Sequence, residues 1–316
     1  MKLGRVISAA GSTGVDFAAV GEISLDTFAR GAGASAHQSK NSVNDIVDLA
    51  GGQAATAAVA CARLGWRARW IGAVGDDSAG EYALSALKHD RVEIHAVTRN
   101  NVTSRRAVIL VDSTTGDRQV FQHRSEQLNI RPGEFPTQTY TTTRILLVDA
   151  SDPGHALDAA RIARAAGVAT MVDVDYVWPG LHELLREIDV FILPGSIAET
   201  AAGVSGVGAA LAEIGRVSGA AAVVTTLGPE GAVAWAGGHE VRVAATEVHV
   251  VDTTGAGDAF RAGFAAGWLA RAGTDPDLAE LLADANLVAG LACRALGAQT
   301  SLPRALEVPA HLRGRV

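Results

Sequence analysis

Apolar segments with the character of β-strands alternate with helical segments over most of this 316-residue chain. In the middle of the chain, strands are expected at 145–148, 168–173 and 190–193, with helices at 154–166 and 180–187 between them. Repeated units of this length favour a mostly parallel sheet with helices covering both faces. The alternation therefore predicts an α/β fold.

The N-terminal part of the chain follows the same alternation. Strands are expected at 15–20 and 68–74, and helices at 53–64 and 78–89. The first of these helices consists of small residues and ends at Gly65, which serves as its C-terminal cap. Both halves of the chain are therefore expected to contribute to one sheet.

One insertion interrupts this order. Between residues 96 and 130 the pattern becomes purely β, because the segments 106–112 and 118–124 flank a polar turn at 113–117 and so predict a hairpin. Together with residues 27–49, this stretch is our candidate for a small β-rich appendage. We expect one domain over residues 1–316 that carries this appendage.

The final third of the chain adds more strands and two long helices. We expect a strand at 221–226, a hairpin over 232–243 and a strand at 247–251. Helices are expected at 258–272 and 277–296.

Composition and charge exclude several classes of function. The net charge is −7 and no Lys/Arg cluster follows a phosphate backbone, so nucleic acid is not an expected partner. Cys61 and Cys293 lie far apart, which excludes a disulfide framework and a zinc motif. Residues 1–21 are too polar for a signal peptide, and no run of 18 apolar residues exists to span a membrane. We expect a cytoplasmic protein.

The most informative stretch is residues 250–264, where a strand is expected to pass through the turn Gly255-Ala256-Gly257-Asp258 into a helix. Such a turn directs free backbone N–H groups to one point, and the helix dipole adds positive potential there. Glycine allows the close approach of an anion and the positive φ that tight turns often require. We interpret the turn as a phosphate-binding anion hole.

Asp258 lies beside those donors, where a base accepts the proton of a hydroxyl that attacks a γ-phosphoryl group. The helix N-terminus is expected to keep the carboxyl charged. On spacing alone, Asp258 also fits a simple helix N-cap. A dinucleotide fingerprint is disfavoured because Phe260 occupies the position of its third glycine, and the chain contains no Gly-x-x-x-x-Gly-Lys-Ser/Thr loop.

The full stretch resembles the C-terminal signature of the ribokinase-like sugar kinases, the phosphofructokinase B type family. A second resemblance, to that family's N-terminal signature, covers Gly51-Gly52-Gln53-Ala54-Ala55-Thr56-Ala57-Ala58, Ala62–Gly65 and Gly72–Asp77. The resemblance implies a central, mostly parallel sheet flanked by helices, a small β-sheet lid formed by the appendage, and ATP-dependent phosphorylation of a sugar-type hydroxyl.

By resemblance, the sugar is bound by Asp26, which follows the first strand, and by the backbone at Gly51 and Gly52. Thr56 stands where the family usually carries an Asn that binds a sugar hydroxyl. Because a threonine cannot donate as an amide does, this departure leaves the identity of the sugar open. Asp26 also fits a capping residue in a loop.

The resemblance also implies nucleotide and metal contacts. Ser196 and Glu199 correspond to the family's Asn-x-x-Glu, whose Glu organises Mg²⁺ through water near the phosphates. On spacing alone, Glu199 also fits a surface charge in the first turn of a helix. The residues expected beside the nucleotide are Ser196, Thr226, Gly228, Gly231 and Asn286.

A monovalent cation, K⁺, is a secondary expectation from the resemblance. Its residues would be Asp252, Thr254, Ala292, Gly297 and Ser301.

Two further departures concern the substrate. Asp173-Val174-Asp175 stands where the family often has Asp-x-Asn followed by an Arg, but here Tyr176 follows. Four arginines of the hairpin have the length to reach a phosphate or carboxylate of a substrate, although exposed arginines more often face solvent. They are Arg105, Arg106, Arg118 and Arg124.

The leading hypothesis is therefore transfer of phosphate from ATP to a sugar-type hydroxyl. Two alternatives remain open: a kinase for nucleosides or other non-sugar alcohols, and a catalytically silent relative that binds a sugar or nucleotide. The intact Gly255-Ala256-Gly257-Asp258 argues against the silent relative. Uncovered sheet edges in the lid also favour a homodimer formed through it.

Overall fold

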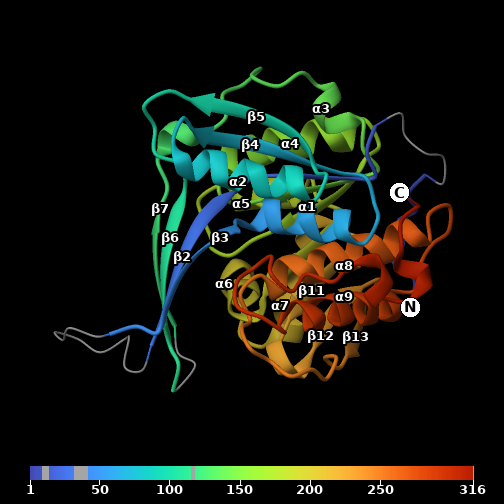
Figure 1. The fold of residues 1–316 in the computed structure, drawn as a ribbon. Coiled ribbons are helices and arrows are strands. Elements are labelled where there is room, and N and C mark those ends of the chain that lie inside the picture. The colour runs from blue at the N-terminus through green and yellow to red at the C-terminus, as the bar shows by residue number, and fades with distance from the viewer. Residues whose placement is uncertain (9–13, 32–41, 115–117, 316) are drawn as a thin grey trace.

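The computed structural model describes residues 1–8, 14–31, 42–114 and 118–315. The described strands form one large sheet and one small sheet (Figure 1). The large sheet contains, in spatial order, β13 (His239–Val243), β12 (Ala232–Ala236), β11 (Ala222–Thr226), β10 (Val190–Pro194), β9 (Ala169–Asp173), β8 (Ile145–Asp149), β1 (Phe17–Val20), β4 (Ala68–Gly75) and β5 (Glu93–Arg99).

All neighbours from β11 to β5 pair in parallel, and β12 and β13 complete one edge in antiparallel pairing. The central parallel strands β8, β9 and β10 are buried almost throughout and are mainly apolar, as burial on both faces requires. The α/β fold with a mostly parallel sheet, predicted from the alternation, is confirmed.

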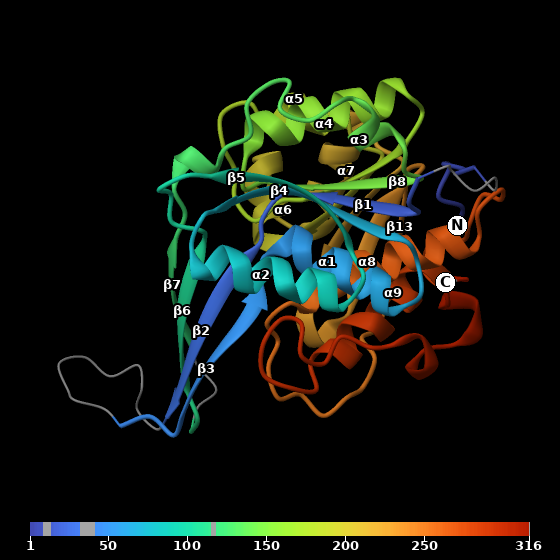
Figure 2. The same ribbon diagram turned by 45° about the horizontal axis from the view of Figure 1, so that its top comes forward.

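Helices cover both faces of this sheet (Figure 2). One face packs against α1 (Gln53–Arg63), α2 (Ser78–His89), α8 (Ala256–Ala270) and α9 (Leu278–Ala292). The other packs against α3 (Gln138–Thr141), α4 (Pro153–Ala165), α5 (Leu181–Leu185), α6 (Gly195–Ala202) and α7 (Val207–Ser218). Small residues bring α8 close to α9, since a Cβ atom at Gly263 would lie 2.8 Å from the Cβ of Val288.

The small sheet, which we call the lid, has the order β3-β2-β6-β7 and stands at one end of the large sheet (Figure 1). Its strands are β2 (Ser24–Gly31), β3 (Asp45–Gly51), β6 (Arg106–Asp112) and β7 (Arg118–His123). The predicted hairpin is confirmed by the antiparallel register of β6 and β7. The sheet begins three residues before position 27, and residues 96–99 belong to β5 of the large sheet, where they pair with β4.

Two regions differ from the sequence-based expectation. The strand expected at 247–251 does not form, because the sheet ends at β13 and the N–H groups of Val251 and Asp252 donate to the carbonyl of Cys293. Helices α6 and α7 were not predicted, since glycines interrupt residues 195–218 and weaken the helical pattern. Within the described ranges no single helix is both long enough and apolar enough for a membrane span. Helices α6 and α7 meet the two criteria only when taken together, and they are bent by 54° relative to each other.

Candidate active site

The carboxyl ends of the central parallel strands meet beneath the lid, and carboxylates stand at two of these ends. Asp149 is the last residue of β8 and Asp173 is the last residue of β9, and each is only 1% exposed. The amino end of helix α8 points at the same region, since Arg261 of α8 contacts Asp173. Ligands of open α/β sheets bind outside such strand ends.

The glycine-rich turn begins α8 as predicted. Gly255 has φ 77° and precedes the first helical residue, Ala256. A Cβ atom at Gly255 would lie 2.7 Å from the backbone of Ala298, and one at Gly257 would lie 2.8 Å from a guanidinium nitrogen of Arg261. Glycine is therefore required at 255 by both backbone conformation and space.

Asp258 lies in the first turn of α8, with 13% of its side chain exposed. Its Oδ1 atom is 3.7 Å from Nη1 of Arg261, one helical turn further on. The Nη2 atom of Arg261 donates to Asp173 Oδ1 and, at 3.1 Å, to the carbonyl of Ile192. Arg261 thus connects the candidate base, Asp258, to the end of β9. Two atoms of this cluster, Asp173 Oδ2 and Arg261 Nε, are buried without a hydrogen-bond partner.

The pKa of Asp258 is raised to about 7, first by burial and then by the nearby carboxylates of Asp149, Asp175 and Glu22. Arg261 acts in the opposite direction and lowers this pKa. Burial and the neighbouring carboxylates thus oppose the helix N-terminus, which is expected to favour the charged form of Asp258. A base with a pKa near neutrality is well matched to proton transfer at physiological pH.

A cavity of about 390 Å³ opens on the side of α8 that faces β11 and α9. Four residues predicted beside the nucleotide line it, together with two of the glycine-rich turn: Thr226, Gly228, Gly231, Asn286, Ala256 and Gly257. The amide of Asn286 donates to the carbonyls of Val243 at 3.2 Å and Ala244 at 2.9 Å, so it also ties α9 to the segment after β13. The cavity is lined mainly by apolar side chains, as a nucleobase site requires.

Ser196 and Glu199 lie on α6 and do not line this cavity. Oε1 of Glu199 accepts a hydrogen bond from Gly206 N at 2.7 Å, and Ser196 is exposed. Within the described ranges no group of three His, Cys, Asp or Glu side chains is arranged to hold a metal ion.

The residues expected to hold a monovalent cation come together in two adjoining loops. Asp252 Oδ1 accepts from Thr254 N at 3.0 Å and Thr254 Oγ1 at 2.8 Å, and its Oδ2 accepts from Gly297 N at 2.8 Å. Ser301 Oγ donates to the carbonyl of Ala292. The loops bracket the start of α8, so they can position the glycine-rich turn.

The predicted sugar-binding residues lie where the lid meets α1. Asp26 is 6% exposed, and its Oδ1 accepts from Ser24 Oγ at 2.7 Å. Burial raises the pKa of Asp26. A Cβ atom at Gly51 would lie 2.1 Å from Asp26 Oδ2, and Gly52, with φ 93°, precedes α1.

Thr56 is fully buried within α1. Its hydroxyl accepts a hydrogen bond from Gln299 Nε2 at 3.3 Å. The side chain is therefore already engaged by the C-terminal segment of the chain.

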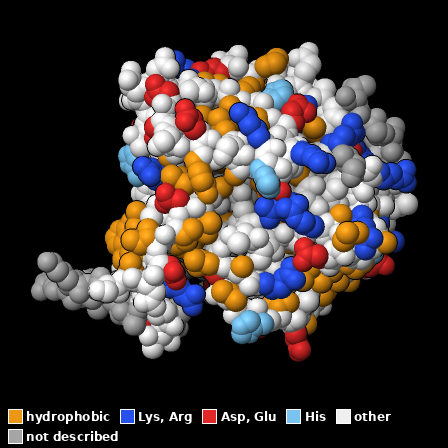
Figure 3. Space-filling model, in the orientation of Figure 1, with side chains coloured by type: hydrophobic (Ala, Val, Ile, Leu, Met, Phe, Trp, Pro, Cys, Tyr) orange, Lys and Arg blue, Asp and Glu red, His pale blue; other side chains and the backbone are white. Residues whose placement is uncertain are grey.

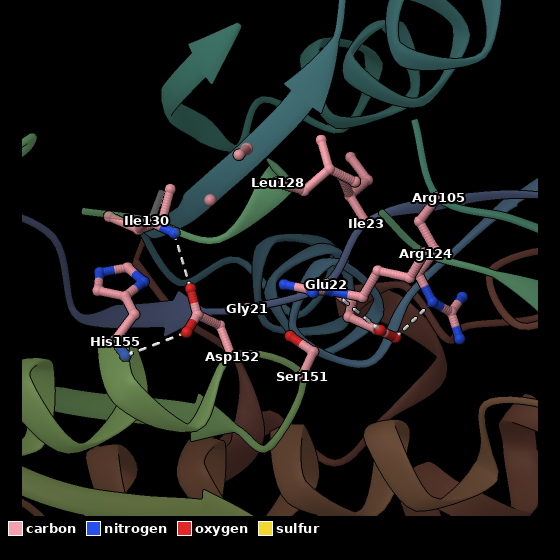
Figure 4. Close-up of a pocket in the computed structure, with 12 residues that line it drawn as sticks. Gly21, Glu22, Ile23, Arg105, Arg124, Leu128, Ile130, Ser151, Asp152 and His155 are labelled. Atoms are coloured by element: carbon pink, nitrogen blue, oxygen red, sulfur yellow. Dashed lines mark hydrogen bonds and ion pairs between the residues drawn. The ribbon is translucent and has the colours of Figure 1, made fainter. Parts of the chain in front are cut away.

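Sequence reasoning missed a second cavity, of about 340 Å³, between the lid and the strand ends. Arg105 and Arg124 reach into this region from the lid and flank the carboxylate of Glu22 (Figure 4). Glu22 follows β1 and Asp149 is the last residue of β8, and this strand-end position was the signal that could have identified them. The cavity is lined by Glu22, Gln53, Arg105, Gln122, Arg124, Ser151, Asp175 and Tyr176.

The fold defines a class of protein: an α/β protein of ribokinase-like fold, with a glycine-rich turn at a helix N-terminus, a buried carboxylate beside it and a lid above. Among solved structures, a putative ribokinase from Agrobacterium tumefaciens superposes with a TM-score of 0.83 at 24% identity, covering 93% of this chain and 96% of that chain. This likeness confirms the fold.

The chain belongs to the pfkB family of carbohydrate kinases, which it matches over residues 16–305. Aminoimidazole riboside kinase of Salmonella typhimurium is 29% identical over 287 residues, covering 82% of this chain and 86% of that protein. Fructoselysine 6-kinase of Shigella flexneri is 34% identical over 225 residues, covering 70% of this chain and 82% of that protein. The activity is therefore that of an ATP-dependent carbohydrate kinase.

Proposed function

We propose that this kinase transfers the γ-phosphoryl group of ATP to a hydroxyl of a sugar or sugar-like molecule, with Asp258 as the catalytic base. The backbone N–H groups of Gly255, Ala256 and Gly257 form the anion hole that stabilises the charge developing on the phosphoryl oxygens. The observation that carries the proposal is the position of Asp258. It adjoins residues that line the nucleotide cavity, and its pKa responds to carboxylates at the cavity under the lid.

In this step the acceptor oxygen bonds to the γ-phosphorus while the bond from that phosphorus to the β–γ bridging oxygen breaks. ADP leaves, and the proton of the hydroxyl passes to the ionised carboxylate of Asp258. Asp26, Gly51, Gly52 and Thr56 are proposed to form or support the sugar site. Thr56 would act indirectly, by shaping the start of α1, because its hydroxyl is buried against Gln299.

Mg²⁺ bound with ATP would neutralise phosphate charge, and Glu199 would hold one of its waters. Thr226, Gly228, Gly231 and Asn286 would contact the nucleotide. Ser196, exposed on α6, is proposed to contact the phosphate end.

We further propose that K⁺ binds between the two loops that contain Asp252, Thr254, Ala292, Gly297 and Ser301 and so orders the anion hole. Turnover would then rise when KCl replaces tetramethylammonium chloride. Equal rates in the two salts would remove this part of the proposal.

The lid is proposed to pair with the lid of a second copy. Figure 3 shows apolar side chains gathered over the lid strands, on the left of the view. Four large apolar side chains of these strands are between 45% and 70% exposed: Ile46, Val108, Val120 and Phe121. Phe121→Lys should shift the sedimentation coefficient to that of a monomer, and a wild-type chain that already sediments as a monomer would contradict the pairing.

The decisive experiment is a screen for ADP release over ketoses, pentoses, sugar acids, sugar phosphates, nucleosides and fructoselysine, with Asp258→Asn as the control. The proposal predicts at least one acceptor whose turnover depends on Asp258. Turnover confined to nucleosides would favour the nucleoside kinase alternative, which the likeness to aminoimidazole riboside kinase supports. If no acceptor gives turnover while ATP still binds, the chain is the silent relative.

A further inference from the structure

The cavity under the lid contains two cations in close proximity. Arg105 precedes β6 and Arg124 follows β7, so both stand at the open end of this antiparallel hairpin, and their side chains are 15% and 21% exposed. Charged side chains are seldom withdrawn from solvent to this extent without a partner. Their partners therefore indicate what the cavity is built to hold.

The two guanidinium groups share one anion, the carboxylate of Glu22. Arg105 Nε lies 2.8 Å from Glu22 Oε2, and Arg124 Nε lies 3.9 Å from Glu22 Oε1 (Figure 4). The remaining polar contacts of these arginines are to neutral groups, at 2.9 Å to Gln122 Oε1 and at 2.6 Å to Asn129 Oδ1. Although Asp26 and Asp175 also interact with the charge of Arg105, Glu22 is the one carboxylate among the described residues within ion-pair distance of both guanidinium groups.

That carboxylate is poorly stabilised in its charged form. The pKa of Glu22 is raised to about 7, because burial and the carboxylates of Asp149 and Asp175 together outweigh the two arginines, which lower it. Protonation of Glu22 near neutral pH therefore costs little free energy. The protonated side chain leaves the guanidinium pair without an anion.

Asp149, at the end of β8 beside the cavity, is better supplied with donors than the arginines are with acceptors. Asp149 accepts from the backbone N–H groups of Glu22 at 2.7 Å, Ala54 at 3.3 Å and Ser151 at 3.0 Å, and from Ser151 Oγ at 2.5 Å. Asp175 is exposed at the mouth and accepts from Gln53 Nε2 at 3.3 Å. This asymmetry favours an anionic occupant over a cationic one.

We propose that the acceptor substrate is a sugar that carries an anionic substituent, a carboxylate or a phosphate, and that this group binds Arg105 and Arg124 in place of the Glu22 carboxylate. Glu22 takes up a proton as the anion enters, so the charge of the cavity is conserved. This inference rests on the proposed kinase function and specifies its substrate class. Paired guanidinium groups suit both anions, because each presents oxygens to their forked donors.

The test compares turnover of matched acceptors by the full chain: fructose against fructose 6-phosphate, ribose against ribose 5-phosphate, glucose against gluconate, and glucosamine as the cationic arm. We expect the anionic member of at least one pair to have the higher kcat/KM. The phosphate and carboxylate arms distinguish the two anions. Preference for a neutral sugar or for glucosamine, with turnover still dependent on Asp258, would overturn the inference and leave the proposed function intact.

Variants of the cavity give a second, independent readout. Arg124→Gln should raise KM for the anionic acceptor by about 10-fold to 100-fold, as expected for a charge-assisted hydrogen bond, with little change in kcat or in KM for ATP. Arg106→Gln, in the adjoining strand but outside the cavity lining, is the matched control and should leave all three constants unchanged.

Glu22→Gln separates this role from a merely structural one. In the wild-type chain, KM for the anionic acceptor should rise between pH 6 and pH 8 as Glu22 loses its proton. Because the amide of Glu22→Gln mimics protonated Glu22, this variant should have a lower KM that does not change over that pH range. A higher KM in Glu22→Gln would overturn the inference. The loss of all turnover in every arm, including the wild-type chain, would instead count against the kinase function itself.

Discussion

The cavity proposed for the nucleotide and the cavity proposed for the acceptor are built in different ways. The nucleotide side has its proposed anion hole in consecutive residues, Gly255 to Gly257, and the rest of its lining also comes from the C-terminal third of the chain. The acceptor side is assembled from the ends of β1 and β8, the start of α1 and both strands of the lid hairpin. The nucleotide side is apolar with backbone donors, whereas the acceptor side is crowded with charges.

The sharpest way to break the nucleotide side is Gly255→Ala. The substitution places a side chain at φ 77° and brings a Cβ atom within 2.7 Å of the backbone of Ala298. We expect kcat/KM for ATP to fall by about 100-fold or more, as when an oxyanion donor is lost.

Gly203→Ala is the matched control, because Gly203 has φ 66° at the end of α6 with no atom within 4 Å of its added Cβ. Its cost should be confined to about 1–2 kcal/mol of backbone strain in a thermal unfolding experiment. Equal kinetic losses in the two variants would show that the anion hole does not depend on the turn at 255.

The link between the two sides is Arg261, and its removal should change the pH profile of kcat. Arg261 lowers the pKa of Asp258, so Arg261→Gln should move the acid limb to higher pH by about one unit, which costs about fivefold in rate at pH 7 and about tenfold well below it. Because the base is active only when ionised, the rate is lost on the acidic side. An unchanged profile would contradict this role.

Asp173→Asn should move the same limb in the opposite direction. Asp173 is the anion that competes with Asp258 for Arg261, so its neutralisation leaves the guanidinium freer to stabilise ionised Asp258. The double variant, Asp173→Asn with Arg261→Gln, no longer buries an unpaired Asp173 carboxylate. It should therefore recover the stability lost in Arg261→Gln, as measured by Tm. Shifts of the same sign in the two single variants would exclude an electrostatic relay.

Gly51→Ala tests the acceptor side with a single methyl group. The added Cβ atom would lie 2.1 Å from Asp26 Oδ2 and must displace that carboxylate. We expect KM for the acceptor to rise about tenfold, with KM for ATP unchanged, since only the acceptor side depends on Asp26. A matching rise in KM for ATP would mean that the two sides are not separable.

The smallest effect is expected from Asn286→Ala in the nucleotide cavity. The variant removes two hydrogen bonds that hold the segment after β13 against α9. Loss of about 1 kcal/mol of binding should raise KM for ATP by about fivefold, with kcat unchanged. A lower kcat at saturating ATP would indicate a role in the chemical step.

The same division explains how much could be predicted from the sequence. Strand and helix alternation predicted the α/β fold, and the contiguous glycine-rich turn identified the start of α8. The lid hairpin was visible because its two strands flank a polar turn, whereas the strand at 247–251 was wrongly predicted because β propensity cannot reveal that no neighbouring strand is available.

The charge state of Asp258 could not be predicted, because the carboxylates that raise its pKa follow strands distant in sequence. Glu22 and Asp149 were missed for the same reason: each is an isolated acidic residue in the chain and acquires meaning only from the parallel register of β1 and β8. The charge interactions between residues at the ends of different strands can be known only once the tertiary fold is known.

The central claim is that Asp258 serves the chemical step and not the binding of the nucleotide. The most direct test is to measure, for Asp258→Asn and the wild-type chain, both kcat with the best acceptor and Kd for ATP by calorimetry. The account predicts that kcat falls by about 10²-fold to 10⁴-fold while Kd for ATP stays within about threefold. A variant that keeps wild-type kcat, or that loses activity only because ATP no longer binds, would contradict it.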